Sequence, residues 1–485
     1  MTEGELVMES QGNLQREYSQ DLEKSHKPRE FRFDFIRGGL ILLFNNLFVR
    51  LGGYAYRILT ANLLEISEYG ILSLALPVQS GLLLVTSGGV APGVAKYVAE
   101  GRDVLRSSFV FYTLFSSLIT IILIFLILLF SPFGEKARIP LIIASASIPF
   151  GVLISVLTGN FQGKRKYGRM CFVLSFEQVM RIILAFLFIG LGATGAILGS
   201  TLGFVISLFL AFLLMPFRPS FGKEYKEVFL FSIPASVTAI GAFLLYNIDT
   251  LCLGWLDTYR NVGLYNAASP TARIVMGISV AASASLLPLI VSSEEKEIFW
   301  RQSQRFTAFF LFPATGILVA MPEWILKLLF KDEFVLAKNS LIILAIGMFF
   351  FAFYTLSTSV FQGIGMPHIP MYILMVSTML DIILNVILIP IYHINGASLS
   401  TSISCVYAFF MSIFFLRPFG FKLDTDAILR GFVSVLLPFF LWYHFKGLAG
   451  LFLGLVTYIS FFVFFKGITK EEIELLFKWL RTLHK

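Results

Sequence analysis

The chain has 485 residues, of which 57% are hydrophobic and 14% are charged, with a formal net charge of +8. Globular proteins average about 45–50% apolar and about 25% charged residues, so this composition, with a mean hydropathy of +0.81, excludes soluble, disordered and collagen-like classes. We expect an all-α polytopic membrane protein. Cys171, Cys252 and Cys405 lie in apolar runs without metal-ligand or pairing spacing, so we expect neither a zinc site nor a disulfide framework.

Apolar runs long enough to cross a bilayer recur along the whole chain. The hydrocarbon core needs roughly 20 apolar residues per spanning helix. The sequence predicts about fourteen transmembrane helices, at 38–58, 71–95, 107–130, 139–159, 171–191, 194–216, 229–253, 263–291, 306–330, 340–362, 369–391, 396–416, 427–445 and 448–465.

The two ends of the chain are predicted to lie outside these spans. Residues 1–30 are polar and lack the apolar core of a signal peptide, so we expect a disordered cytoplasmic arm. At the other end, Thr469 and Glu472 match a capping box, and apolar residues follow at helical spacing. This pattern predicts an amphipathic helix over 468–485 on the membrane surface.

The distribution of Lys and Arg predicts the orientation of the chain. If the N-terminus is cytoplasmic, the inner segments carry 27 of the 38 basic residues and the outer loops carry 7. Cytoplasmic loops are enriched in Lys and Arg, so we expect both termini on the cytoplasmic side of the cell membrane. Topology accounts for the positive charge without a nucleic-acid partner. The other four basic residues lie within spans: Arg50, Arg57, Arg181 and Arg273.

A long-period repeat divides the first twelve spans into two sets of six. The triplet Phe161-Gln162-Gly163 recurs as Phe361-Gln362-Gly363 at an offset of 200, and the segment 68–72 resembles 261–265 at an offset of 193. Six is an even number, so the two six-helix lobes should be related by a pseudo-twofold axis along the membrane normal. We expect an N-lobe at 31–225, a C-lobe at 226–420 and two extra C-terminal helices within 421–467.

Basic residues inside the predicted spans are candidates for substrate contact, because each costs about 2.5–3.5 kcal/mol to insert. Asn46, Arg50 and Arg57 share one face of the first span, and Arg273 lies in the middle of the eighth. A guanidinium keeps its charge and matches phosphate oxygens, so these four residues predict a site for a pyrophosphate group. The alternatives are that Arg57 snorkels to the outer interface and that Arg50 and Arg273 pair with carboxylates.

Polar oxygens gather in the predicted C-lobe spans. Carboxylate, amide and hydroxyl oxygens are ligands for hard cations, so a site for Na⁺ or H⁺ is predicted at Asp249, Asp381, Asn385 and Thr401. The alternative is that Asp249 pairs with Arg57 or Arg273.

A fifth-span acid and base stand one helical turn apart. Glu177 and Arg181, four residues apart, can neutralise each other. We therefore expect a structural pair, with a role in gating or proton movement as the alternative.

Short motifs at both repeats resemble a known family. The segments 61–70 and 254–265, with the Phe-Gln-Gly triplets after spans 4 and 10, resemble the polysaccharide (oligosaccharide) transporter family over residues 33–465. That family belongs to the multidrug/oligosaccharidyl-lipid/polysaccharide (MOP) exporter superfamily, with the lipid II flippases and the multidrug and toxin extrusion antiporters. The resemblance implies two six-helix lobes around a central cavity that opens alternately to each side. It also implies cavity-facing arginines on spans 1 and 8, and Na⁺ ligands on the acidic spans in some members.

The motifs of common enzymes are missing from the sequence. There is no GxxxxGK[ST] phosphate loop, no HExxH and no GxSxG, so we expect a transporter that is neither an enzyme nor a direct ATPase. The favoured function is flipping of a lipid-linked oligosaccharide by a monomer, with no cofactor beyond a coupling Na⁺ or H⁺. The alternative is a cation-coupled multidrug antiporter, which the four intramembrane arginines disfavour. A membrane glycan ligase or polymerase would need long catalytic loops.

Overall fold

The computed structural model describes residues 28–217 and 219–465, and within these ranges every regular element is a helix. The predicted N-terminal arm up to residue 27 and the predicted surface helix at 468–485 lie outside the described residues. The helices are α2 (Pro28–Leu63), α3 (Ile66–Ser87), α4 (Val90–Ala99), α5 (Leu105–Phe130), α6 (Glu135–Ala146), α7 (Ile148–Gly163), α8 (Tyr167–Phe188), η1 (Ile189–Leu191), α9 (Gly192–Leu214), α10 (Tyr225–Leu256), α11 (Tyr259–Arg273), α12 (Met276–Ser292), α13 (Lys296–Ala320), α14 (Pro322–Leu329), η2 (Asp332–Ala337), α15 (Lys338–Gly363), α16 (His368–Leu416), η3 (Arg417–Phe419), α17 (Thr425–His444) and α18 (Leu448–Phe464).

In the described part, eight helical segments are long and apolar enough to cross a membrane, or nine if α13 and α14, bent by 85°, form one span. Some of these segments are longer than one crossing. The 49-residue helix α16 would extend about 74 Å if straight, against a hydrocarbon core of about 30 Å. Its backbone is non-helical at His393 (φ 52°, ψ −129°), and Ser377 Oγ donates to the Ser404 carbonyl at 2.7 Å. The helix therefore folds back on itself at His393.

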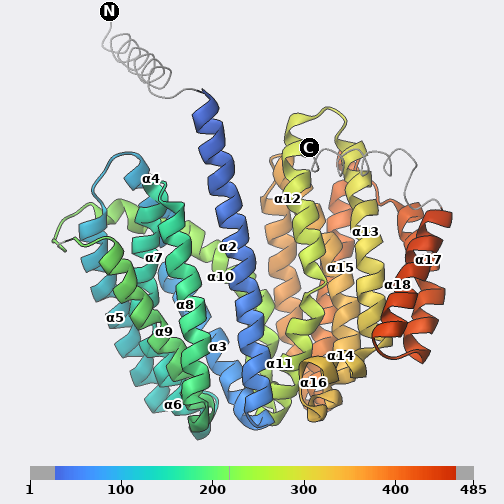
Figure 1. The fold of residues 1–485 in the computed structure, drawn as a ribbon, viewed down its shortest axis with the longest axis horizontal. Coiled ribbons are helices and arrows are strands. Elements are labelled where there is room, and N and C mark those ends of the chain that lie inside the picture. The colour runs from blue at the N-terminus through green and yellow to red at the C-terminus, as the bar shows by residue number, and fades with distance from the viewer. Residues whose placement is uncertain (1–27, 218, 466–485) are drawn as a thin grey trace, which may run out of the picture.

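The helices form two groups that lie side by side (Figure 1). The first group contains α3 to α9, and the second contains α11 to α16 with α17 and α18 packed on its outer edge against α13. Helix α2 stands between the groups in this view and packs on α8.

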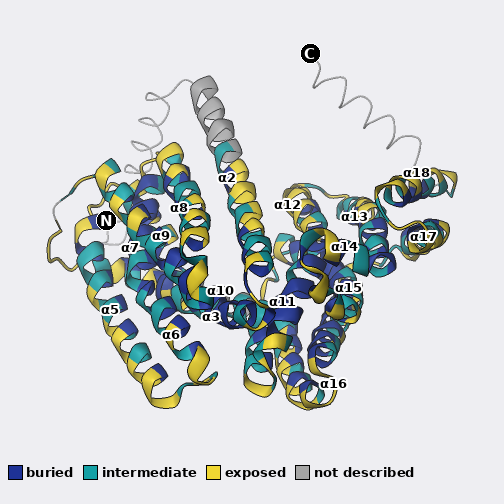
Figure 2. Ribbon diagram, turned by 60° about the horizontal axis from the view of Figure 1, so that its bottom comes forward, coloured by how far each residue is buried: buried dark blue, intermediate teal, exposed yellow. Residues whose placement is uncertain are grey.

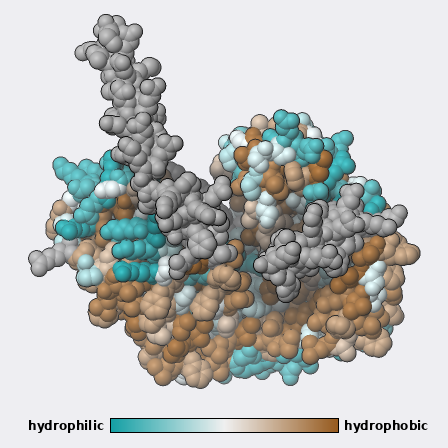
Figure 3. Space-filling view, turned by 45° about the horizontal axis from the view of Figure 1, so that its top comes forward, coloured by the Kyte–Doolittle hydropathy of each residue, from teal (hydrophilic) through white to brown (hydrophobic). Residues whose placement is uncertain are grey.

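Apolar side chains cover the outside of both groups. Phe125, Phe130, Phe186 and Phe452 are among many large apolar residues that are more than half exposed. Figure 3 shows a brown apolar band below an end that is rich in hydrophilic side chains. Such a surface is stable only where lipid is the solvent, and the helical backbone satisfies its own hydrogen bonds there.

Two buried apolar clusters show where the groups are joined. One cluster runs from Tyr56 of α2 and Ile71 of the first group through Leu264 to Phe361 and Tyr458 of the second. The other is confined to the first group and includes residues of α4, α5 and α7. Figure 2 shows buried residues concentrated where α3, α10 and α11 come together.

Two glycines allow the groups to meet backbone to backbone. A Cβ on Gly70 of α3 would lie 1.8 Å from the Tyr259 carbonyl oxygen, and one on Gly263 of α11 would lie 2.2 Å from the Ile66 carbonyl oxygen. Only residues without a side chain fit such a crossing. Nearby, Asn62 Nδ2 donates to the Leu329 carbonyl at 2.7 Å. The contact is therefore close and reciprocal.

Helix boundaries in the structure follow the offsets found in the sequence. Helices α2 and α10 end at Leu63 and Leu256, at the offset of 193 that relates Gly70 to Gly263. Helices α7 and α15 end at Gly163 and Gly363, at the offset of 200. The turn after each uses the same bonds: the residue 166 amide donates to the residue 161 carbonyl at 2.8 Å, and the residue 366 amide to the residue 361 carbonyl at 2.8 Å. The two halves are thus built on one local plan at these points.

Helix α10 has partners in both groups. Its first turns pack on α5, where the Tyr225 and Phe111 rings stack at 4.1 Å between centroids and the Tyr112 and Ser232 hydroxyls are 3.4 Å apart. Its last turns pack on α16 and place Asp249 beside Thr401. Helix α10 also stays against α3 of the first group to its end, because a Cβ on Gly81 would lie 2.6 Å from the Phe243 ring and one on Gly254 would lie 2.3 Å from Leu74. Its last turns therefore contact both groups.

Candidate transport site between the two helix groups

The carboxylate of Asp249, near the end of α10, is the centre of a buried polar cluster. Its side chain is completely buried. Its Oδ2 accepts a hydrogen bond from the Tyr265 hydroxyl, lies 3.3 Å from Arg273 Nη2 and lies 3.4 Å from the Thr401 hydroxyl. Its Oδ1 accepts from the Thr250 amide at 2.7 Å. The predicted alternative in which Asp249 pairs with Arg273 is therefore the arrangement in the structure.

A second buried carboxylate belongs to the same cluster. Asn385 Nδ2 donates to Asp381 Oδ1 at 3.1 Å, one helical turn away on α16. Asp381 also interacts electrostatically with Asp249 and Arg273. Both Asp381 Oδ2 and Asn385 Oδ1 are buried without a hydrogen-bond partner. The structure thus brings the four residues of the predicted ion site into one cluster.

These residues fit a small cation. The cluster contains two buried oxygens that accept no hydrogen bond, together with the Thr401 hydroxyl and the Asp249 carboxylate. These atoms form an oxygen-rich donor set. Hard cations prefer such oxygens, and a proton on a carboxylate would satisfy the same unpartnered atoms.

Arg273 lies at a break in a spanning helix. It is the last residue of α11, and α12 begins at Met276. Ile274 and Val275 between the two helices keep helical dihedral angles, so this interruption of the spanning segment 259–292 is local. The guanidinium also lies 5.5 Å from the centroid of the Tyr246 ring, and the side chain is 22% exposed.

The basic residues predicted on the first span lie along α2. Asn46 and Arg50 are exposed, and Arg57 is half-buried. Arg57 interacts with the Tyr69 hydroxyl and is within electrostatic reach of Arg273 and Arg181.

Arg50 of the same helix is within electrostatic reach of Tyr246, the residue beside Arg273. Among the described residues, no carboxylate lies within 4.0 Å of the Arg50 or Arg57 guanidinium. Arg273 differs from them, because it forms an ion pair with Asp249. The structure therefore places arginines of α2 and α11 on facing sides of one region.

The members of the predicted pair, Glu177 and Arg181, are not within 4.0 Å of each other, but Glu177 interacts electrostatically with Arg181. The Arg181 guanidinium lies over the Tyr56 ring of α2, 4.5 Å from its centroid. Glu177 Oε1 and Arg181 Nε are buried without a hydrogen-bond partner. The reason is that α2 packs on α8, so an aromatic face is available to the guanidinium.

Sequence reasoning did not find the aromatic partners of these charges. Tyr265 donates to Asp249, Tyr246 lies beside Arg273 and Tyr56 lies under Arg181. For Tyr56 the internal repeat offered a signal, because the offset of 193 relates this residue to Asp249. The position equivalent to a predicted site residue was therefore a candidate for contact with a charge.

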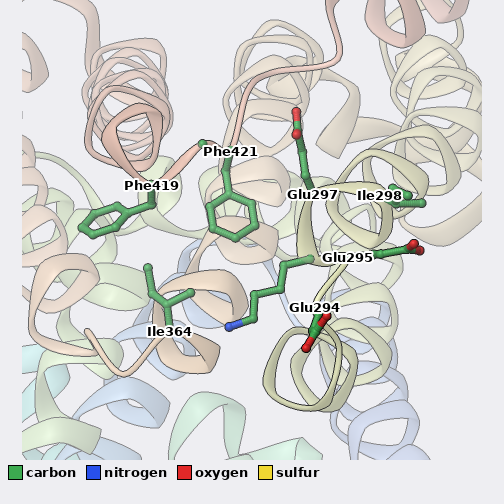
Figure 4. A pocket seen from close by; sticks show the side chains of 9 residues that line it. Glu294, Glu295, Glu297, Ile298, Ile364, Phe419 and Phe421 are labelled. Atoms are coloured by element: carbon green, nitrogen blue, oxygen red, sulfur yellow. The ribbon is translucent and has the colours of Figure 1, made fainter.

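A separate cavity of about 510 Å³ is built from other residues. It is lined by the connection from α12 to α13, by Ile364 and by the segment 419–421 (Figure 4). Its labelled acids are Glu294, Glu295 and Glu297. None of the predicted site residues lines it, so its chemistry is distinct from that of the arginines and of Asp249.

The sequence matches two families of membrane proteins. The family described as polysaccharide biosynthesis protein matches residues 35–294, and the MatE family matches residues 234–387. An uncharacterized membrane protein of Methanocaldococcus jannaschii is 26% identical over 408 residues, which cover 78% of this chain and 97% of that protein. A probable low-salt glycan biosynthesis flippase of Haloferax volcanii is 28% identical over 272 residues, which cover 54% of this chain and 57% of that protein.

Solved structures share the fold. The lipid II flippase MurJ in an inward closed conformation superposes with a TM-score of 0.76 at 17% identity, covering 88% of this chain and 99% of that chain. An inward-facing multidrug resistance MATE transporter of the MOP superfamily gives a TM-score of 0.62 at 17% identity, covering 76% of this chain and 94% of that chain. The chain shares the fold of these two solved proteins. Because the first family matches more than half of its residues, the chain belongs to the polysaccharide biosynthesis protein family.

Proposed function

We propose that this transporter flips a lipid-linked oligosaccharide, carried on a polyprenyl pyrophosphate, from the cytoplasmic to the outer leaflet of the cell membrane. The observation that carries the proposal is the set of arginines on facing helices. The Tyr54 hydroxyl of α2 and the Thr271 hydroxyl of α11 are 3.0 Å apart. Arg57 and Arg273 follow them within one helical turn. Of these two arginines, only Arg273 has a carboxylate partner within 4.0 Å among the described residues. Two guanidinium groups held near each other repel unless an anion joins them. A pyrophosphate between the two guanidinium groups would supply negative charge and oxygens with suitable hydrogen-bond geometry.

The proposed path lies between the helix groups. The pyrophosphate would contact Arg50, Arg57 and Arg273, with Asn46 of α2 near the entrance. Both termini would be cytoplasmic, the first twelve of fourteen spans would form the two lobes, and the contact of α3 with α11 would close the outer side. Rocking of one lobe against the other would then expose the site to each side in turn. We propose that a single copy of the chain is sufficient.

We propose that Na⁺ or H⁺ at Asp249, Asp381, Asn385 and Thr401 couples this movement to an ion gradient. The support is the fit of the donor set: the unpartnered oxygens of Asp381 and Asn385 are buried in a cluster that already contains a second carboxylate. A cation there would supply positive charge to two carboxylates that share one guanidinium.

A cation-coupled multidrug antiporter is the second candidate. The acidic cluster and the fold shared with a multidrug resistance transporter favour it. However, a cationic drug between Arg57 and Arg273 would meet like charge, and this repulsion favours an anionic substrate.

The direct test is flipping of a fluorescent polyprenyl pyrophosphate oligosaccharide in proteoliposomes. We expect Arg57→Gln to lower the initial rate by a factor of about 100, because one charge-assisted contact of roughly 1.5–3 kcal/mol is removed. Arg301→Gln is the matched control, since Arg301 forms an exposed ion pair with Glu297 at 2.8 Å and should flip like the unmodified protein. Full activity of the Arg57 variant would refute the proposal, and export of a fluorescent cation would favour the antiporter.

A further inference from the structure

We propose that Arg273 is an internal counter-ion of the acid pair formed by Asp249 and Asp381, and that an anion which draws Arg273 away makes this pair bind a monovalent cation more tightly. The inference rests on the proposed function and deepens it, because it assigns one residue to both the anion site and the cation site. It makes the two ligands cooperative through a single side chain.

The contacts of Arg273 place it at the boundary between the two sites. On one side, its Nη2 lies 3.3 Å from Asp249 Oδ2. Toward α2, it is within electrostatic reach of Arg57. Asp249 is completely buried, whereas the Arg273 side chain is 22% exposed. The buried Asp249 thus has a charged partner, Arg273, that an incoming ligand can reach.

The bond between Arg273 and Asp249 is suited to exchange. It involves one nitrogen and one oxygen, and the Arg273 Nε is buried without a partner. A guanidinium held strongly by a carboxylate usually makes two parallel bonds. A single long contact leaves Arg273 with donors that a phosphate group can use.

The side chain of Arg273 can change direction without a change in the backbone. Ile274 and Val275, between α11 and α12, keep helical dihedral angles, so the main chain holds the Arg273 Cα in place. The long side chain has several rotatable bonds and is 22% exposed, so its guanidinium can be redirected by rotation.

Charge balance gives the direction of the coupling. While Arg273 contacts Asp249, two carboxylates share one guanidinium. When Arg273 turns to an anion, the two buried carboxylates lose this positive charge. Asp249 keeps the Tyr265 and Thr401 hydroxyls. Asp381 keeps the Asn385 amide, and all of these partners are neutral. Two buried carboxylates cannot both stay charged without a cation. The affinity for a cation therefore rises, and by reciprocity a bound cation raises the affinity for the anion.

The experiment measures cation binding rather than transport. The full chain is reconstituted in nanodiscs of zwitterionic lipid, and the binding of radioactive Na⁺ is titrated with and without inorganic pyrophosphate as the anion probe. For the unmodified protein, we expect pyrophosphate to tighten Na⁺ binding by about tenfold, in the usual range of coupling between sites. For Arg273→Gln, we expect binding that is already about tenfold tighter without pyrophosphate and that no longer responds to it.

Two further variants separate charge from structure. Arg273→Lys keeps the positive charge and should restore weak Na⁺ binding, a rescue that a purely structural role would not predict. Arg301→Gln removes an exposed arginine outside both sites and should bind Na⁺ like the unmodified protein. If the cation is H⁺, the same tightening should occur in proton uptake, measured with an indicator dye in unbuffered solution without Na⁺.

The outcomes distinguish this inference from the proposed function. If Arg273→Gln binds both Na⁺ and H⁺ no more tightly than the unmodified protein, Arg273 is not the counter-ion and the inference is wrong. If the variant binds either cation more tightly, but neither pyrophosphate nor a polyprenyl pyrophosphate changes the unmodified protein, the counter-ion role holds, whereas the coupling to an anion and the lipid-linked substrate are both wrong.

Discussion

Tyr56 and Arg181 in the first repeat stand at the positions that Asp249 and Asp381 occupy in the second, at offsets of 193 and 200. In the first repeat, the Arg181 guanidinium lies over the Tyr56 ring at 4.5 Å. In the second, one carboxylate lies within electrostatic reach of another. The same backbone positions thus hold an aromatic–cation contact in one half and an acid pair in the other.

This difference assigns separate tasks to the two halves. The first repeat has a cation built into its structure as a side chain, so this position needs no ligand to balance it. The second has an excess of buried acid, which Arg273 balances only in part. The two repeats therefore share helix ends but differ in the charge that is buried at these two positions.

The largest effect is expected from removing the charge at the acid pair. Asp249→Asn ends the attraction to Arg273 and should lower the free energy of unfolding by about 3 kcal/mol, as for other broken buried pairs. At the equivalent position, Tyr56→Phe removes only the hydrogen bond from the Tyr56 hydroxyl to the Ala196 carbonyl, at 3.0 Å, and should cost about 1 kcal/mol. Thermal unfolding in detergent measures both. Equal losses would contradict the comparison.

The reciprocal glycine contact should respond equally from either half. Gly70→Ala and Gly263→Ala each place a methyl group within 2.2 Å of a carbonyl oxygen of the facing helix, so each should destabilise the structure by about 2 kcal/mol. Gly53→Ala on α2 is the control, because nothing lies within 4 Å of its Cβ position. The same unfolding assay applies. A much larger effect at one glycine would show that the contact is not symmetric in energy.

Opposite signs are expected from the repeat-equivalent charges. Arg181→Lys loses the planar contact with Tyr56 and should destabilise the protein by about 1 kcal/mol. Asp381→Asn removes a buried charge, and its new amide can donate to the unpartnered Asn385 Oδ1, so in Na⁺-free buffer it should stabilise the protein by about 1 kcal/mol. Unfolding midpoints that shift in the same direction would contradict the assignment of charge excess to the second repeat.

The smallest effect concerns the turns that follow the Phe-Gln-Gly triplets. Arg165 has a φ of 56° where its counterpart Gly365 has a φ of 79°. Gly365→Ala should cost about 1 kcal/mol, because the left-handed conformation is unfavourable for a side chain. Arg165→Gly relieves the same strain but also removes an interaction of the Arg165 side chain, so its net gain should stay below roughly 0.5 kcal/mol. Chemical denaturation of the two variants side by side measures the difference. A gain at residue 365 would show that the two turns are not equivalent.

Several parts of the fold could be predicted because they depend on periodic or local signals. The apolar runs predicted the helices, and the triplets predicted that α7 and α15 end at the same place in each half. The rarity of charge inside spans also singled out Arg57, Arg273 and Asp249, which the structure places in one region.

The remaining parts depend on how helices rotate against each other. Spacing along α8 suggested that Glu177 pairs with Arg181, but the guanidinium turns across to Tyr56 on another helix. The sequence also left open whether Arg57 or Arg273 is the partner of Asp249, and only the packing of α11 on α10 shows that it is Arg273. Spacing along one helix defines a face, but only packing shows which side chain lies opposite.

The dual packing of α10 has a mechanical consequence. The first turns of this helix belong through Val228 to the apolar cluster that is confined to the first group, and its end belongs through Leu253 to the cluster that joins both groups. The end of α10 therefore ties the two groups together. A relative rotation of the groups would have to shift its contacts with α3 or with α16.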